Sequence, residues 1–379
     1  QNLVPSGVPV RLRISLPNCM MEKKHSKNFK TKKLEYHHPT EILKRFQDFE
    51  DIVFLDSASS NEKNNRYSYI CIDPVHSYVI NSLNKNSLFN SQDEIDIRNI
   101  LKKYRLKNKK NLPDFKCGFA GYISYDHCLG IENIEKINKT SLLMDNIYLG
   151  VFDIVIAFDL KLKKAYLYSY NLDNHFSLKD NINHNIRRNK IINLYNIPRI
   201  FHERLNSADF KWTSELSKNE YLNKIKKILS YIKAGDIFQV NFTQRFKSKI
   251  PKNFSLIQYY TKYRERTKTP FSALIKNGNK SILSFSPERF LKVNQQKITT
   301  SPIKGTVRTD SNKEIDLKLK NELIKSEKDQ AENLMIVDVL RNDLSRVCEH
   351  GSVKVNKLAV LETYKNVHHL VSEIEGKLT

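Results

Sequence analysis

The sequence has few cysteines and no long apolar run. It contains five cysteines among 379 residues, an odd number, and no two of them form a CxxC pair. This pattern argues against a disulfide framework or a structural zinc site and favours a reducing, cytoplasmic location. The best apolar candidate, residues 148–160, is interrupted by Asp153 and Asp159, so it falls short of the about 20 residues that a membrane-spanning helix needs. We therefore expect no membrane partner.

Acidic residues are scarce relative to basic ones, with 41 against 64 and a formal net charge of +23. Clustered Lys and Arg bind nucleic acid by releasing its counterions. Here the lysines are spread along the chain and mixed with asparagine, as in residues 107–111 (KNKKN), and no zinc-finger spacing or RNA-binding aromatic motif accompanies them. We predict a solvated basic surface that attracts an anionic substrate, and no nucleic-acid partner.

The chain is long enough for one large domain or two lobes. Residues 1–20 are interrupted by prolines and arginines, and we predict a non-native or disordered leader, with the natural start at Met20 or Met21. Residues 21–171 are predicted to be sheet-rich, residues 172–212 a connector, and residues 213–379 a second region. The expected strands are 52–55, 67–72, 78–80, 117–126, 151–159 and 164–170, with the last two forming a hairpin.

The second region opens with a clear helix signal. Ser217 and Glu220 form a capping box, apolar residues follow at helical spacing, and Gly235 supplies the stop. Apolar and polar residues then alternate over 238–245, which predicts a strand whose polar face lines a site or meets water. Residues 329–347 are predicted to be a helix with an apolar stripe of Ile336, Val339, Leu340, Leu344 and Val347.

The clearest candidates for catalytic residues are an amine and two carboxylates. Lys304 lies in the motif PIKGT, Glu288 in SPERF, and Glu332 on the edge of the predicted apolar stripe. A neutral primary amine is a nucleophile, and a buried carboxylate must be paired, hydrogen-bonded or bound to metal. Each residue also has a purely structural interpretation: Lys304 pairs with a carboxylate, Glu288 with Arg289, and Glu332 with Lys325 or with solvent.

Five motifs in order resemble the chorismate-utilising enzyme family. They are residues 234–241 (AGDIFQVN), 286–290 (SPERF), 302–306 (PIKGT), 332–344 (ENLMIVDVLRNDL) and 368–372 (HHLVS). The resemblance implies an α+β fold like that of anthranilate synthase component I, a two-lobed sheet sandwich with flanking helices. Within the family, the lysine in the PIKGT motif makes this chain resemble component I of aminodeoxychorismate synthase. Anthranilate synthases usually carry alanine at this position.

The resemblance implies conversion of chorismate and ammonia to 4-amino-4-deoxychorismate, in para-aminobenzoate and folate biosynthesis, with a glutamine amidotransferase subunit delivering the ammonia. Lys304 is then the nucleophile that adds at C2 of chorismate, and Glu288 is the general acid that protonates the departing C4 hydroxyl. Glu332 helps to bind a Mg²⁺ ion that holds a substrate carboxylate. The implied substrate-binding residues are His369, Thr306 and Gln239, the last in the place of a water-activating lysine in isochorismate-forming relatives.

A tryptophan pocket, regulatory in anthranilate synthases, is also implied. The residues that resemble it are Ser57, Asn64, Asn65, Arg66, Tyr67, Pro270, Phe271 and Ser272. Family members continue beyond the HHLVS motif through a substrate-gripping arginine and a second metal-binding glutamate, so we expect this chain to be C-terminally truncated. Two alternatives follow: an anthranilate synthase component I, which releases pyruvate, and an inactive remnant that only binds its partner.

Overall fold

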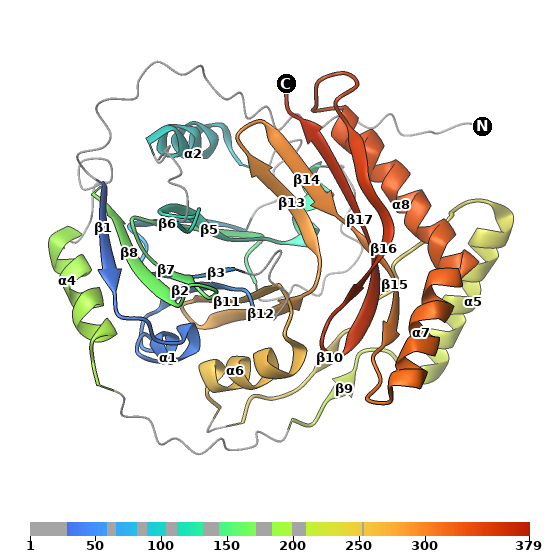
Figure 1. The fold of residues 1–379 in the computed structure, drawn as a ribbon, viewed down its shortest axis with the longest axis horizontal. Helices are drawn as coiled ribbons and strands as arrows, with labels where there is room; N and C mark the ends of the chain where they lie inside the picture. Colours follow the sequence, from blue (N-terminus) through green and yellow to red (C-terminus); the bar gives the residue numbers. More distant parts are fainter. Residues whose placement is uncertain are drawn as a thin grey trace. The chain divides into compact units, whose positions relative to one another are not determined.

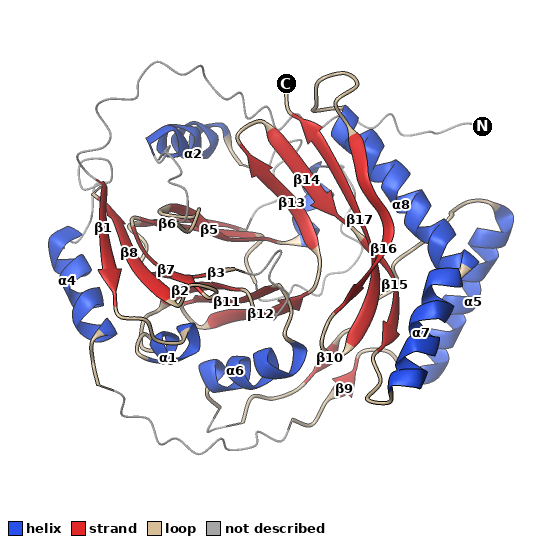
Figure 2. Cartoon of the chain, viewed as in Figure 1, coloured by secondary structure: helices blue, strands red, loops and turns tan. Residues whose placement is uncertain are grey.

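The computed structural model describes residues 29–58, 66–81, 89–103, 112–131, 144–171, 184–198, 210–251 and 254–379. The described residues form helices and antiparallel sheets (Figure 1, Figure 2). The chain divides into two units, Gln1–Pro198 together with Tyr260–Thr379, and Arg199–Tyr259. Among the described helices, none combines the length and the apolar character of a membrane span.

The largest sheet has seven strands in the order β1-β8-β7-β3-β2-β11-β12. Neighbouring strands are antiparallel, and β7 and β8 form the predicted hairpin. Every residue of β7 is buried, which explains why this strand is a continuous apolar run instead of an alternating one. The strands are β1 (Phe29–Leu34), β2 (Asp51–Asp56), β3 (Tyr67–Ile72), β7 (Ile154–Asp159), β8 (Lys164–Tyr170), β11 (Phe271–Asn277) and β12 (Lys280–Ser286).

A second sheet contains β4 (His76–Ile80), β6 (Ile147–Phe152) and β5 (Gly118–Ile123). It shares a core with the first sheet and with helix α2 (Ser91–Lys103), because Val151 of β6, Ala157 of β7 and Ile100 of α2 belong to one buried cluster. The single strand predicted over 151–159 is wrong, since the chain changes sheets between β6 and β7. Asp153, at this break, is fully buried.

Helix α4 (His184–Tyr195) lies within the segment predicted as a connector. Its buried face includes His184 and Arg187 beside Ile191 and Tyr195. His184 Nδ1 lies 2.8 Å from Asp153 Oδ2, and Arg187 donates to the same oxygen at 3.0 Å. A helix is predicted from apolar residues at helical spacing, but two positions of this buried face hold a histidine and an arginine. Their burial depends on a partner that is far away in the sequence.

A third sheet, of five strands, lies in the C-terminal part of the chain. Strands β14 and β15 pair with consecutive stretches of β17, and β16 pairs with the opposite edge of β17. Val337, Leu344 and Ile374 share a buried cluster that joins helix α8 to this sheet. The elements are β13 (Arg289–Asn294), β14 (Lys297–Ser301), β15 (Ile303–Arg308), α7 (Lys313–Lys325), α8 (Glu327–Ser345), β16 (Lys354–Thr363) and β17 (Val367–Lys377).

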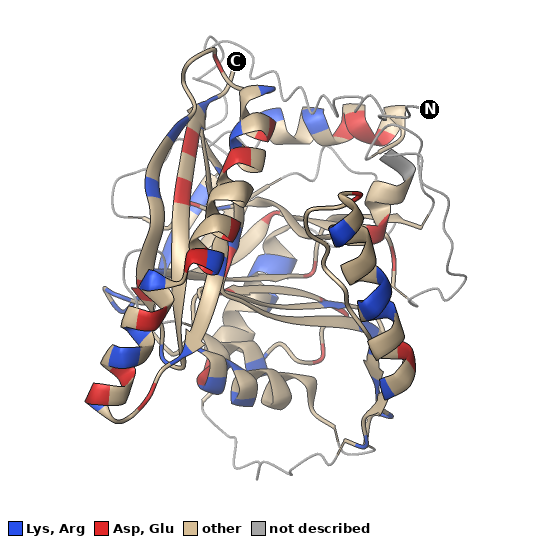
Figure 3. Ribbon diagram, turned by 90° about the vertical axis from the view of Figure 1, so that its right-hand side faces the viewer, with Lys and Arg blue, Asp and Glu red and all other residues tan. Residues whose placement is uncertain are grey.

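Helix α8 confirms the helix predicted over 329–347 and most of its apolar stripe, because Leu344 is buried and Leu340 and Val347 pack against the same cluster. Asn333, Val337 and Leu344 are its buried residues, whereas Val339 is 52% exposed. The predicted stripe is therefore wrong at Val339, and it missed two buried residues, Val337 and the polar Asn333. Residues of both charges occur on α7 and α8, and Figure 3 shows helices that carry both signs, as expected for a solvated mixed surface.

The unit Arg199–Tyr259 contains helix α5 (Lys218–Ala234) between two short strands, β9 (Thr213–Ser214) and β10 (Phe246–Lys247). The predicted capping box and the stop at Gly235, which has φ 81°, are confirmed. The strand predicted over 238–245 is wrong: this segment is irregular, and Phe238 is 91% exposed. A strand needs a neighbour to satisfy its backbone groups, and within the described residues β9 reaches only β10.

The remaining helices are α1 (Pro39–Lys44), the 3₁₀ helix η2 (Tyr125–His127), α3 (Cys128–Ile131) and α6 (Leu256–Thr267).

Candidate functional site

A β-bulge in the PIKGT motif sets the position of Lys304. Lys304 pairs with Leu370 of β17, but the next pair is Thr306 with His369, so Gly305 is the extra residue. Gly305 has φ 82°, and an added Cβ would lie 3.1 Å from Asp329 Cβ and 3.2 Å from Leu323 Cδ1. Only glycine combines this backbone conformation with so close an approach to α7 and α8.

Replacing Gly305 with alanine is therefore expected to lower the free energy of unfolding by about 2 to 6 kcal/mol, since strain of about 1–3 kcal/mol adds to overpacking of about 1–3 kcal/mol. Urea unfolding followed by circular dichroism measures this difference. Gly278→Ala is the matched control, because Gly278 also has a positive φ, 57°, but an added Cβ there meets nothing within 4 Å. Equal losses in the two variants would contradict the packing argument.

Lys304 and Glu332 form an ion pair. Lys304 Nζ lies 3.6 Å from Glu332 Oε1, and the two side chains are 23% and 27% exposed. The structure thus brings together the amine and one of the two predicted carboxylates. The pair joins β15 to the N-terminal half of α8, on the strand side of the bulge where Lys304 lies.

Glu288 lies beside the backbone of the same motif. Its Oε1 accepts a hydrogen bond from the backbone N–H of Ile303 at 3.1 Å, which places the carboxylate next to the residue that precedes Lys304. The suggested partner Arg289 instead lies over the ring of Phe271, with its guanidinium carbon 4.7 Å from the ring centroid. Glu288 itself is exposed, so it can reach a molecule bound at this surface.

Thr306 and His369 form a second pair. Thr306 Oγ1 lies 2.8 Å from His369 Nδ1, and the ring of Tyr364 packs edge-on against the imidazole with centroids 5.5 Å apart. Burial lowers the pKa of His369, while the carboxylate of Glu362 acts in the opposite direction. A neutral imidazole offers one donor and one acceptor, which suits contact with an oxygen-rich ligand.

Replacing Glu362 with glutamine is expected to lower the pKa of His369 further, because it removes the negative charge that favours the imidazolium form. Histidine-selective NMR titration measures this value, and Asp338→Asn, at an exposed site on α8, is the control. Since the folded-state pKa of His369 is already below its unfolded value of about 6.5, this residue stabilises the fold fully above about pH 6.5 and less as the pH falls below it. A rise in the pKa of His369 would contradict the assignment.

The described residues contain no group of three or more His, Cys, Asp and Glu side chains suited to a metal ion. Glu332 offers a single half-buried carboxylate, and its neighbour is a cation. Mg²⁺ often binds through one or two carboxylates plus water and substrate oxygens. The described residues therefore suit a Mg²⁺ ion that is bound partly by water and substrate oxygens, and they do not form a complete metal site by themselves. Gln239 belongs to the unit Arg199–Tyr259, in the irregular segment after α5.

The residues of the predicted tryptophan pocket that the structure describes lie at the ends of β2, β3 and β11; Asn64 and Asn65 lie outside the described residues. Ser57 Oγ donates to the carbonyl of Tyr67 at 2.8 Å. Arg66 donates to Asp159 Oδ2 at 2.8 Å, and Ser272 Oγ lies 2.7 Å from Thr269 Oγ1. Pro270 is buried and Phe271 half-buried. The polar groups of Ser57, Arg66 and Ser272 thus have partners within the protein.

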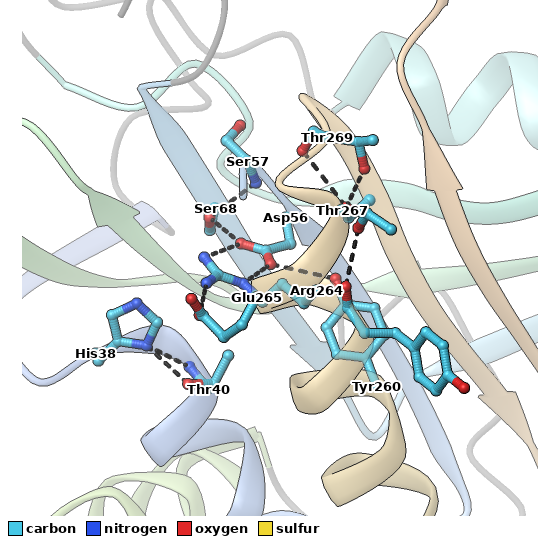
Figure 4. Close-up of polar contacts among 12 residues, drawn as sticks. His38, Thr40, Asp56, Ser57, Ser68, Tyr260, Arg264, Glu265, Thr267 and Thr269 are labelled. Atoms are coloured by element: carbon cyan, nitrogen blue, oxygen red, sulfur yellow. Dashed lines mark hydrogen bonds and ion pairs between the residues drawn. The ribbon is translucent and has the colours of Figure 1, made fainter. Parts of the chain in front are cut away.

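A buried polar network beside Ser57 was not predicted (Figure 4). Asp56 accepts hydrogen bonds from Ser68 Oγ at 2.8 Å and from Tyr260 OH at 3.2 Å, and it also pairs with Arg264. The side chains of Asp56 and Arg264 are 0% and 6% exposed. The network joins α6 to β2 and β3, and the sequence signal for it was only a carboxylate at the end of an apolar run.

The chain combines an α+β fold with an amine, two carboxylates and a histidine gathered around β15 and β17. A family model described as chorismate binding enzyme matches residues 53–379, and the chain belongs to this family. It is 29% identical to anthranilate synthase component 1 of Acetivibrio thermocellus, over 90% of this chain and 72% of the relative. It is 33% identical to aminodeoxychorismate synthase component 1 of Klebsiella aerogenes, over 70% of this chain but only 55% of the relative.

The fold is similar to a crystal structure of anthranilate synthase component I from Streptococcus pneumoniae TIGR4. The TM-score is 0.68 at 23% sequence identity, over 83% of this chain and 69% of that chain. This likeness confirms the fold that the motifs implied.

Proposed function

We propose that the chain is a component I of aminodeoxychorismate synthase, which forms 4-amino-4-deoxychorismate from chorismate and ammonia. The observation that carries the proposal is Lys304, held beside Glu332 by the bulge at Gly305, with Glu288 bound to the adjacent backbone. Similarity to the Klebsiella aerogenes aminodeoxychorismate synthase component 1 supports the choice of product. A separate glutamine amidotransferase subunit is the proposed source of ammonia, and the cytoplasm is the proposed location.

The proposed chemistry has two balanced steps. The neutral amine of Lys304 forms a bond to C2 of chorismate while both conjugated ring double bonds shift and the C4–O bond breaks, and Glu288 gives its proton to the departing oxygen, which leaves as water. Ammonia then forms a bond to C4 while both double bonds shift back and the C2–N bond to Lys304 breaks, and the new ammonium group returns a proton to Glu288. The net change replaces hydroxyl with amine at the same carbon.

The other proposed roles concern binding. Glu332 is the proposed oxygen ligand of a Mg²⁺ ion, which would neutralise a carboxylate of the substrate. Thr306 and His369 are proposed to contact chorismate, whose negative charge suits the basic surface of the chain. Tryptophan binding at Ser57, Arg66 and Ser272 would require the ligand to replace contacts that these side chains already make within the protein.

Product analysis tests the proposal. The chain is incubated with chorismate, ammonium and Mg²⁺, and the products are separated by liquid chromatography and identified by mass spectrometry. Because the chain spans 55% of the Klebsiella aerogenes relative, the assay is repeated with the rest of that relative added as a second polypeptide. We expect 4-amino-4-deoxychorismate. Anthranilate with pyruvate would overturn the proposal in favour of anthranilate synthase, and the absence of any product in both assays would favour a remnant.

A further inference from the structure

Asn333 is a buried amide in the middle of an otherwise apolar contact. It is 1% exposed and lies on α8, on the same buried face as Val337 and Leu344. Its side chain donates to the carbonyl of Leu370 at 3.4 Å and accepts from Ser372 Oγ. Both partners belong to β17. A buried amide with two such partners is directional, whereas the apolar contacts of Val337 and Leu344 are not.

The two hydrogen bonds of Asn333 connect α8 to β17, and β17 in turn pairs with β15, which carries Lys304 of the candidate site. Leu370 is the cross-strand partner of Lys304, and Glu332 is the residue that precedes Asn333 in α8. The ion pair between Lys304 and Glu332 then connects β15 back to α8. If α8 rotated or slid against β17, Val337 and Leu344 would exchange one apolar neighbour for another, but Asn333 would lose both hydrogen bonds. Asn333 therefore fixes the angle and the height of α8 at Glu332.

A third contact strengthens this arrangement from the other side of β17. The backbone N–H of Ala359, in β16, donates to Ser372 Oγ at 2.9 Å. Ala359 has φ 48°, a left-handed conformation that is uncommon for alanine. It lies in an irregular stretch of the pairing between Lys357 and Val360. Ser372, which is fully buried, thus links the bulged edge strand to α8 through Asn333.

We propose that Asn333 is a positioning residue, which holds α8 on β17 so that the Glu332 carboxylate faces the Lys304 amine. The inference rests on the proposed function for its catalytic meaning, because Lys304 and Glu332 are the proposed nucleophile and metal ligand. The geometric part of it, the dependence of the Lys304–Glu332 contact on Asn333, can be measured without substrate.

Zero-length cross-linking with a carbodiimide measures that contact, because it joins an amine and a carboxylate only when they touch. The Lys304–Glu332 amide is quantified by peptide mass spectrometry, relative to the Lys320–Asp316 amide, whose atoms lie 2.7 Å apart. Asn333→Ala is expected to lower the Lys304–Glu332 yield at least about fivefold, the change in population that follows from losing one buried hydrogen bond. The Lys320–Asp316 yield should stay constant, which shows that the protein is folded.

Two further variants keep the test decisive. Asn333→Asp retains an acceptor for Ser372 but loses the donor to Leu370, so it should lower the yield as well, even if the alanine variant unfolds. Asn342→Ala, at an exposed position of the same helix, should leave the yield unchanged. A normal Lys304–Glu332 yield in folded Asn333→Ala or Asn333→Asp protein overturns the inference. Because no chorismate is present, an inactive chain does not affect the result.

Discussion

Replacing Lys304 with alanine is expected to reduce formation of 4-amino-4-deoxychorismate at least about 10³-fold, because the reaction then lacks the group that forms a covalent bond to C2. The measurement is the rate of product formation with ammonium as the nitrogen source, which removes any dependence on a glutamine-hydrolysing partner.

Lys304→Arg separates nucleophilic from electrostatic roles. Arginine keeps a positive charge beside Glu332, but it is not deprotonated in proteins and does not act as a nucleophile. The covalent proposal therefore expects the arginine variant to be as inactive as the alanine variant. If arginine restored most of the activity, Lys304 would serve only as the cationic partner of Glu332, which is the structural interpretation that the sequence left open.

Arg264→Met is expected to lower the free energy of unfolding by about 3–5 kcal/mol, because it leaves the fully buried carboxylate of Asp56 without its cation. Urea unfolding monitored by circular dichroism measures the loss. Arg341→Met is the matched control: Arg341 and Asp338 are 53% and 60% exposed, so their pair should contribute less than about 1 kcal/mol.

A double variant distinguishes the charge from the packing. Asp56→Asn combined with Arg264→Met removes both charges, and it should be more stable than Arg264→Met alone because no unpaired charge remains buried. If the double variant were less stable than the single one, the hydrogen bonds from Ser68 and Tyr260 to the Asp56 carboxylate would outweigh the ion pair.

Local signals in the sequence predicted local structure. The start and end of α5 follow from Ser217, Glu220 and Gly235, because capping depends on residues a few positions apart. The strand over 67–72 was predicted with the bounds that the structure has, since its β-branched and aromatic residues stand between polar turns. The motifs also located Lys304, Glu288, Glu332 and His369, but not which of them touch.

Long-range partners account for what the sequence did not reveal. Arg187 is buried beside Asp153 and Arg264 beside Asp56, and in each case the partner is far away in the sequence, so the local segment does not indicate the burial. The alternation over 238–245 satisfied the pattern of a strand, yet pairing depends on a neighbouring strand that no local pattern encodes. In the same way, the contact between Lys304 and Glu332 joins a strand to a helix 28 residues further along the chain, and no local pattern encodes it.

The arrangement of the seven-stranded sheet has a consequence for how the chain is made. Strand β2 has β11 as its neighbour on one side, and β11 is synthesised only after α4, α5 and α6. During translation the edge of β2 that pairs with β11 therefore has no partner strand until the residues between β2 and β11 have been synthesised. Exposed strand edges promote aggregation, and pairing between distant segments slows folding. We expect newly made chains to need chaperone protection until β11 is available, so the yield of soluble protein should rise when translation is slowed or chaperones are supplied.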